Sequence, residues 1–594
     1  MATPRSAPRA GAHTALGLAL VLGLLAACGA PGGGPPTDGA PDNGGPDNGA
    51  PDNGSPTACL PAEGFDRTWL GTSSDDWSDG ENWSPAGVPT NEEHAYVCET
   101  ESASPRLTAD TAVGALTVAP GAQVRLATFT LNVHGDLDLT AGSVDVESGS
   151  LRSVGDGAIL TGTLPTITIN ALTAAGAPLS VDGDLTLGLD RPAHLDPNGH
   201  TLTVLGNLAT TSVGCLTSTR PEDRVVIHGP TTLNGWSNQA HCALNAGTLE
   251  LRGDLTTTAG QLFDRLTPGP GHTTRLAGTA QQTITIGGLA LGHPQGNRFH
   301  DLEIANPSGV IFTDPVDVRG DVRFTDTAGS VTSTATVHLD GNIDEPHGGE
   351  RWQVATTDLR GNERELGVPD VLPGNLIVNA HLALGRSLTV VGNLTIGTAT
   401  GASLDAGPDT LTVQGNLTTF SGSNVNGCLA MIGATTHVIV HGDARFNGYT
   451  SFYPERCGMT DGTLDVRGDF STAAVFSNMF TPTLQHRVRL SGAALQQVAF
   501  GATADHPQAN RFQHVEIVNA AGVTFSQDAR VEGQLDLVGR MTNQAVLTIP
   551  LGGSLLLRSG SYLDNSAGSI ALGGTCSAEP DADGVGVPPA CLSD

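Results

Sequence analysis

A short phrase recurs along most of this chain and constrains its fold more than any other feature. The phrase alternates apolar and polar residues, then places a Gly followed by Asp or Asn and another apolar residue. Within two runs its glycines are 23 to 27 residues apart: Gly183, Gly206, Gly229, Gly253, Gly278, then Gly392, Gly415, Gly442, Gly468 and Gly492. Alternation with a period of two predicts β-strands. A strand-rich unit repeated at this interval is typical of a solenoid, in which each coil buries its inner face against its neighbours.

We therefore expect an all-β chain folded as a parallel β-helix, with roughly twenty coils between residues 105 and 575. The alternative is a pair of β-sandwich domains, which do not need a glycine at this interval. Aromatic residues make up 4% of the chain, so we expect the interior to consist of aliphatic columns. We expect the repeated Gly to make a turn and the Asp or Asn to follow it.

The chain also contains a second repeat that is much longer than one coil. The segment HPQGNRFHDLEIANPSGVIF from His293 returns from His506 as HPQANRFQHVEIVNAAGVTF, 213 residues later and identical at 12 of 20 positions. Cys215 and Cys428 are also 213 residues apart. The chain thus contains a duplicated block, at about 160–367 (block 1) and 368–575 (block 2), preceded by first coils at 105–159. We expect His293 and His506 to be loop residues.

The cysteines suggest a disulfide framework. The chain has nine, and eight fall into neighbouring pairs: Cys59/Cys98, Cys215/Cys242, Cys428/Cys457 and Cys576/Cys591. A metal site would favour closer ligand spacing, whereas an even number in an exported chain favours disulfides. Because two of the pairs are 27 and 29 residues apart, about one coil, we expect each to join a loop to the adjacent coil. Residues 576–594 form a C-terminal disulfide tail.

The N-terminus has the features of an export signal. Residues 1–27 combine Arg5 and Arg9 with an apolar run too short to span a membrane. Residues 28–57 repeat Pro-Asp-Asn-Gly and predict a solvated linker. The tetrapeptide ending at Cys28 resembles the lipobox of bacterial lipoproteins, which implies cleavage before Cys28 and its acylation. By that resemblance, Gly29 after the cysteine implies the outer membrane. The alternative is an ordinary cleavable signal with a chance cysteine.

Several phrases resemble bacterial surface proteins with right-handed parallel β-helices, such as filamentous-haemagglutinin-like and autotransporter passenger regions. These phrases are TAQQTI from Thr279, NRFHDLEI from Asn297 and VDVRGDV from Val316. The stretch TWLGTSSDDWSDGENWSPAGVP from Thr68 is similar to a segment that precedes such repeats. The resemblance implies a right-handed helix on the cell surface and an N-terminal cap at 58–104. It implies no particular activity.

Two groups of residues are candidate ligand contacts. Trp69, Trp77 and Trp83 could stack on sugar rings, or they could close the open end of the solenoid, the interpretation that we favour. Oxygen-rich stretches could hold Ca²⁺, although neither matches an EF-hand loop. Their acidic residues are Asp75, Asp76, Asp79, Glu81, Asp581 and Asp583. We expect no other cofactor.

Arg-Gly-Asp occurs at residues 252–254, 319–321 and 467–469. It could indicate integrin binding, but the same column also carries His134-Gly135-Asp136 and Asp182-Gly183-Asp184, so the repeat itself accounts for the motif. No nucleophile elbow, nucleotide-binding loop or zinc-protease motif occurs. Carboxylates from different coils could still converge into an active site.

The formal charge of −32 argues against nucleic acid as a partner. We expect a non-enzymatic lipoprotein of the cell envelope, anchored to the membrane through Cys28 and presenting a β-helical rod. Its role would be adhesion, binding of matrix, surface proteins or carbohydrate, or purely structural. The alternative is a polysaccharide lyase or hydrolase built on the same fold.

Overall fold

The structure is a computed structural model that describes residues 63–99, 103–211, 213–235, 242–258, 265–287, 296–361, 364–422, 426–448, 454–473, 478–501 and 510–591. The predicted signal peptide, Cys28, the linker and Cys59 lie outside the described residues. All named strands belong to one compact unit, Pro56–Asp594. A search of the described ranges finds no helix with the length and apolarity needed to cross a membrane.

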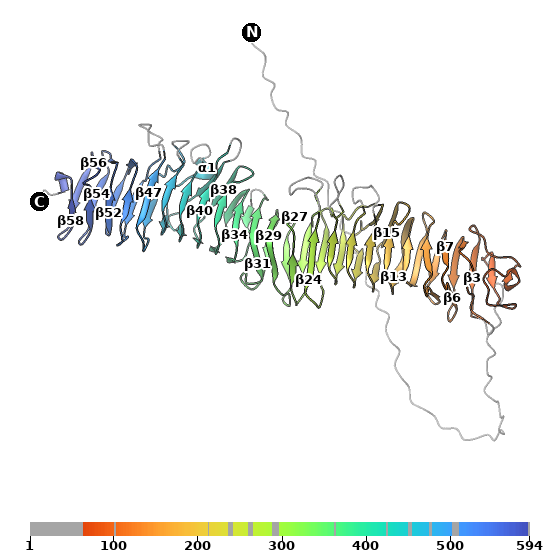
Figure 1. Cartoon of the computed structure of the whole chain (residues 1–594). Coiled ribbons are helices and arrows are strands. Elements are labelled where there is room, and N and C mark those ends of the chain that lie inside the picture. The colour runs from red at the N-terminus through yellow and green to blue at the C-terminus, as the bar shows by residue number, and fades with distance from the viewer. Residues whose placement is uncertain are drawn as a thin grey trace, which may run out of the picture. The chain divides into compact units, whose positions relative to one another are not determined.

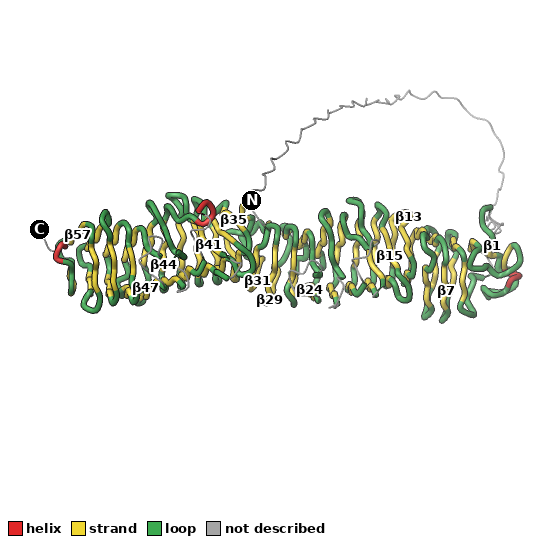
Figure 2. The backbone as a smooth tube through the Cα atoms, turned by 90° about the horizontal axis from the view of Figure 1, so that it is seen from above, coloured by secondary structure: helices red, strands yellow, loops and turns green. Residues whose placement is uncertain are grey.

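The chain folds as a parallel β-solenoid of about 20 turns (Figure 1). A typical coil contains three strands, each on a different side of the coil: β16 (Thr201–Val204), β17 (Leu208–Thr210) and β18 (Gly214–Leu216). These strands pair in parallel with strands one coil earlier. Figure 2 shows strands stacked side by side and joined by loops. This stacking confirms the β-helix prediction and excludes the β-sandwich alternative.

Three long ladders of paired strands run along the coils, beside several shorter ones. The long ladder runs from β4 (Thr111–Val113) to β58 (Asp583–Val585) and passes through both blocks. The first-half ladder ends at β30 (Ile343–Asp344), and the second-half ladder runs from β33 (Val371–Leu372) to β57 (Thr575–Ala578). The long ladder thus continues between residues 344 and 371, where the first-half ladder ends and the second-half ladder begins.

Helices are few and short within the described ranges. The α-helix α1 spans Pro454–Cys457, and two 3₁₀ helices, η1 and η2, span Gly80–Asn82 and Pro589–Cys591. The first strands, β1 (Arg67–Trp69) and β2 (Trp83–Ser84), are antiparallel to each other and precede the coils. The chain is therefore nearly all-β, as the alternating pattern predicts.

Alternation decides which side chains form the core. In β16, Leu202 and Val204 are fully buried, whereas Thr201 and Thr203 are half-buried on the outer face. Most of the interior is Leu, Val and Ile, as expected from the composition. In block 2, however, five phenylalanines form one cluster with neighbouring ring centroids 4.7–5.9 Å apart: Phe446, Phe470, Phe480, Phe500 and Phe512. The prediction of a purely aliphatic interior is therefore wrong for this block.

The repeated glycines lie where the backbones of successive coils approach most closely. A Cβ on Gly206 would lie 2.5 Å from Gly183 O, and one on Gly468 would lie 2.4 Å from Gly442 C. Real Cβ atoms do not come this close to backbone. None of the repeated glycines has a positive φ. Most of them lie in bends between strands, as predicted, but a glycine is needed there because a side chain would push two coils apart, not because φ is positive.

The Asp or Asn after each glycine holds the next coil. Asp184 Oδ1 accepts a hydrogen bond from the backbone N–H of Asn207 at 2.8 Å. Asn416 accepts from Asp443 N at 2.8 Å, and Asp443 accepts from Asp469 N at 2.9 Å. Because each side chain binds a backbone amide one coil further on, Asp and Asn serve equally well.

A buried polar network occurs once in each block. Gln282 Oε1 accepts from Gly278 N at 2.9 Å, its Nε2 donates to Gly253 O at 2.7 Å, and Asn306 Nδ2 donates to Gln282 Oε1 at 2.9 Å. Gln496 and Asn519 make the corresponding bonds in block 2, at 2.9, 2.6 and 2.9 Å. The duplication thus extends to the interior, where each buried amide group is satisfied.

Candidate functional site

The three tryptophans of the N-terminal segment form a buried cluster. Trp69 and Trp77 are 0% exposed and Trp83 is 2% exposed. Trp83 packs edge-on against both neighbours, with ring centroids 5.1 Å from Trp69 and 4.7 Å from Trp77. Rings without accessible faces cannot stack on a sugar, so the interpretation as a carbohydrate platform is wrong. Their burial against the first coils agrees with a capping role.

The acidic residues beside these tryptophans make local turns. Asp76 Oδ1 accepts from Ser78 N and Thr108 Oγ1, each at 2.8 Å. Hydrogen bonds from the Ser73 side chain and the Glu81 amide lower the pKa of Asp79. At the other end of the chain, Asp581 and Asp583 are exposed. Across the described ranges no three His, Cys, Asp or Glu side chains are grouped so as to hold a metal ion, and calcium binding stays a prediction.

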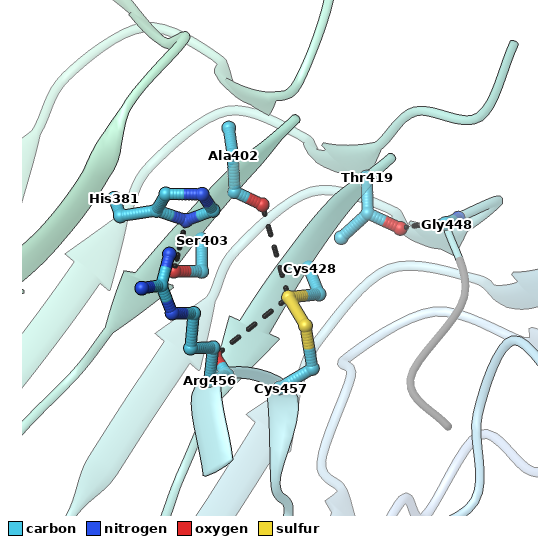
Figure 3. The surroundings of a disulfide bond; sticks show 8 residues. All are labelled: His381, Ala402, Ser403, Thr419, Cys428, Gly448, Arg456 and Cys457. Carbon is cyan, nitrogen blue, oxygen red and sulfur yellow. Dashed lines mark hydrogen bonds between the residues drawn. A yellow bond between two sulfur atoms is a disulfide. The ribbon is translucent and has the colours of Figure 1, made fainter. Parts of the chain in front are cut away.

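Three of the four predicted cysteine pairs are disulfides: Cys215–Cys242, Cys428–Cys457 and Cys576–Cys591, with Cα–Cα distances of 5.5, 5.5 and 4.7 Å. Cys98 is also disulfide-bonded, but its predicted partner Cys59 lies outside the described residues. Figure 3 shows how Cys457, on α1, is tied to Cys428, whose Sγ lies 3.8 Å from Ala402 O on the preceding coil. The two equivalent bonds hold a loop against a coil in each block, as predicted.

Buried threonines fix the base of the same loops. Thr210 Oγ1 accepts from Asn234 N and Gly235 N, each at 2.9 Å, one coil further on. Thr419 makes the equivalent bonds in block 2, with Gly448 N at 3.0 Å (Figure 3). Loop bases are therefore built alike in both blocks. His293 and His506 lie outside the described residues.

The Arg-Gly-Asp motifs have a structural explanation. Asp469 Oδ1 accepts from Gln497 N at 2.8 Å, and Asp254 Oδ1 accepts from Thr283 N at 2.8 Å. Arg467 and Arg252 each lie beside a histidine of the preceding coil, at 3.3 Å and 3.0 Å. The motif is thus the repeated Gly-Asp pair described above, with an arginine before the glycine.

This explanation predicts the behaviour of Asp469 variants. Asp469→Asn keeps the acceptor and should leave the free energy of unfolding within about 0.5 kcal/mol of the wild type. Asp469→Ala leaves the Gln497 amide without its partner and should cost about 1 kcal/mol. Denaturant unfolding followed by circular dichroism measures both. An equal loss in the two variants would show that the negative charge of Asp469 matters, contrary to the interpretation that it acts only as a hydrogen-bond acceptor.

Outward side chains form two columns on the first-half and second-half ladders, which we call the polar face. In block 2, one column contains Thr410, His437, Thr463, Arg487 and His514, and the other contains Thr412, Ile439, Asp465, Arg489 and Glu516. In block 1 the equivalent residues are Thr201, Arg224, Thr248, Thr273 and Asp301, beside Thr203, Val226, Glu250, Arg275 and Glu303. Each coil therefore places hydrogen-bonding groups at a regular spacing of roughly 4.8 Å along the solenoid.

In block 1 the polar face is closed by ion pairs. Glu250 is 3% exposed and accepts from Arg224 Nη2 and Arg252 Nε, both at 2.8 Å. Burial alone would raise the pKa of Glu250, but the two guanidinium groups outweigh burial and lower it. The groups that could bind a ligand here are occupied by one another.

Carboxylates from different coils converge at the junction of the blocks. Asp317 on β27 (Val316–Val318), His338 on β29 (Val331–Leu339) and Asp358 on β31 (Trp352–Leu359) stack in register. With Arg319 and Arg360 we call them the junction cluster. His338 Nδ1 donates to Asp358 Oδ2 at 2.8 Å, since a carboxylate can only accept. Arg360 Nε donates to the same oxygen at 2.9 Å, and Arg319 Nη2 donates to Asp317 at 2.8 Å.

The two aspartates of the junction cluster are shifted in opposite directions. Burial raises the pKa of Asp317, and the nearby charge of Arg319 offsets it in part. Burial would also raise the pKa of Asp358, but hydrogen bonds from His338, Arg360 and Asn379 outweigh it and lower that pKa. Asp317 Oδ1 and His338 Nε2 have no hydrogen-bond partner among the described residues. Oppositely shifted carboxylates are the pattern of an acid–base pair, but the three stacked side chains are only 5–8% exposed.

The motif search missed the junction cluster because its members are far apart in the sequence. Asp317, His338 and Asp358 are separated by 21 and 20 residues, about one coil each. The signal was therefore present: aligning the coils by their repeated glycines would have placed the three side chains in one column.

No family model matches this sequence, and no curated protein or solved structure matches it. The proposed function therefore rests on the solenoid, the polar face and the junction cluster.

Proposed function

We propose that the protein is a non-enzymatic cell-envelope lipoprotein whose solenoid binds extracellular polysaccharide. The proposed anchor is Cys28, with residues 28–57 as a linker to the solenoid and the outer membrane as its location. The binding region is the part of the polar face that lies on block 2. The net charge of −32 argues against nucleic acid as a partner.

One observation carries this proposal: each coil of the polar face presents at least one side chain that can form hydrogen bonds. Thr389, Thr412 and Thr410 point outward from neighbouring strands, and charged or histidine side chains continue both columns. A ligand made of repeated units can contact such a surface many times. Polysaccharides meet that requirement and offer hydroxyl groups as both donors and acceptors.

The test is to incubate the purified protein with a panel of acidic and neutral polysaccharides and to measure binding and new chain ends in the same wells. Saturable binding without new chain ends is the expected result. Failure to bind any polysaccharide of the panel would contradict the proposal.

A Cys28→Ser variant tests the membrane anchor. Without the thiol no lipid can be attached, so the protein should move from the membrane fraction to the soluble fraction, as measured by fractionation and immunoblotting. Cys98→Ser serves as a control, because it removes a cysteine but leaves the proposed lipid site. Firm membrane attachment of the Cys28→Ser protein would contradict the lipoprotein assignment.

The second candidate function is polysaccharide hydrolysis, and the junction cluster is the observation that favours it. Asp317 and Asp358 are two coils apart, roughly 10 Å of backbone spacing, near the upper end of the range for inverting glycosidases. The low exposure of the cluster argues against it. If the panel yields new chain ends, Asp317→Asn and Asp358→Asn should each abolish them. Cleavage that survives both changes would place the activity elsewhere.

A further inference from the structure

A cleft opens on the polar face of block 2. It has a volume of about 420 Å³, and its lining includes Thr435, His437, Thr463, Arg487, Arg489 and Glu516. It lies over β42 (His437–Val440), β44 (Thr463–Val466), β46 (Arg487–Leu490) and β48 (His514–Ile517), which are consecutive strands of the second-half ladder. Four strands at roughly 4.8 Å spacing make the cleft about 14 Å long in the direction of the solenoid axis.

The two arginines of the cleft make only long ion pairs with their neighbours. Arg489 lies 3.5 Å from Glu516 and 3.8 Å from Asp465, and Arg487 lies 4.0 Å from Glu516. Within the part of the chain that the structure describes, neither guanidinium makes a side-chain hydrogen bond, and Arg489 Nε is buried without a partner. Both side chains remain more than 40% exposed. Their donors are thus available to a ligand.

Block 1 carries different side chains on the equivalent surface. Arg224 takes the place of His437 and donates a hydrogen bond to Glu250 at 2.8 Å. Thr273 takes the place of Arg487, so one of the two guanidinium groups is missing. Arg275 takes the place of Arg489, lies 3.4 Å from Glu303, and has its Nε buried without a partner among the described residues. The duplication therefore provides an internal comparison: equivalent backbone, with a second outward arginine at this place, Arg487, only in block 2.

We infer that this cleft is a single binding site for the anionic group of an acidic polysaccharide. Guanidinium groups bind carboxylate and sulfate through paired hydrogen bonds. Thr435, Thr463 and His437 provide groups for the hydroxyls of the adjoining sugar. The cleft is open and continuous with the outward threonines Thr410 and Thr412, which suits a chain better than a free anion. The inference rests on the proposed function and names its ligand class.

The test is calorimetric titration of the purified full chain with polygalacturonate, dextran sulfate and neutral dextran. One site per chain is expected, for one or both anionic polymers, and binding should weaken as salt screens the charges. Arg487→Gln/Arg489→Gln should weaken binding at least about tenfold, since each charge-assisted hydrogen bond contributes on the order of 1.5–3 kcal/mol. The thermal midpoint of this variant should fall only slightly, because the arginines make long ion pairs without hydrogen bonds and Asp465 keeps its hydrogen bond from Ser491.

The matched control is Arg275→Gln/Arg323→Gln, which removes two outward arginines from block 1. It should change affinity by less than about twofold, because ligand binding does not use that surface. An equal loss in both double variants would show non-specific attraction and overturn the inference. Neutral dextran bound as tightly as the anionic polymers would overturn it too, while leaving carbohydrate binding intact. Binding of none of the three polymers would remove the proposed function as well.

Discussion

Acidification from pH 7 to pH 4 is expected to destabilise the solenoid by about 3 kcal/mol for each of two buried histidines. His272 and His486 are fully buried at equivalent places in the two blocks, and neither ring has a hydrogen-bond partner among the described residues. Burial lowers the pKa of His272 to about 4 and that of His486 to about 3. The neighbouring imidazoles of His300 and His514 lower them further, and Asp301 opposes the shift of His272.

The sign follows from the unfolded chain, in which a histidine titrates near its model value of 6.5. A pKa depressed in the folded state means that the unfolded state binds protons first. The stability is therefore fully present above pH 6.5 and is lost as the pH falls from 6.5 towards 4 and 3. Carboxylates with lowered pKa values, such as Asp358 and Glu250, begin to lose their contribution only as the pH falls below their model values of 3.8 and 4.5, at the acid end of this window.

Urea unfolding at pH 7 and at pH 4 measures the effect. His272→Leu/His486→Leu should remove most of the pH dependence, because leucine fits an apolar site without titrating. His347→Leu is the control, since His347 is exposed and should leave the pH dependence unchanged. If the double variant retained the full wild-type loss between these pH values, the buried histidines would not be its cause.

Phe470→Ala is expected to lower the local stability of block 2 by about 3–5 kcal/mol. Phe470 is 1% exposed, and its ring lies 4.9–5.6 Å from those of Phe446, Phe480, Phe500 and Phe512. Truncation removes the ring at the centre of this cluster and leaves a cavity that β45 (Phe470–Thr472) cannot close without moving its paired strands.

Hydrogen exchange read by mass spectrometry suits this test, because solenoid coils stabilise only their neighbours. Exchange should accelerate in the strands around β45 and stay unchanged in the coils of block 1. Phe420→Ala is the control: Phe420 is 41% exposed, and its loss should cost no more than about 0.5 kcal/mol. Uniform acceleration along the whole chain would indicate global rather than nearest-neighbour coupling.

The repeat contained the right positions but only part of the reason for its glycines. Their spacing predicts the coils and the bends correctly, yet Gly206 and Gly468 are needed for the close approach of two backbones rather than for a positive φ. A sequence pattern can show that a position does not tolerate a side chain. Only the stacked coils show which atoms a side chain at that position would clash with.

Much of this fold was determined by the sequence alone: the parallel coils, the duplication and the disulfides Cys215–Cys242, Cys428–Cys457 and Cys576–Cys591. These follow from short-range alternation and from offsets that can be counted along the chain. Tertiary structure alone decided that Asp317, His338 and Asp358 are buried together, and that Arg487 and Arg489 make only long ion pairs while Glu250 is hydrogen-bonded by two arginines. Coils differ in length, so the register in which they stack, and hence which side chains meet, is settled by packing rather than by spacing in the sequence.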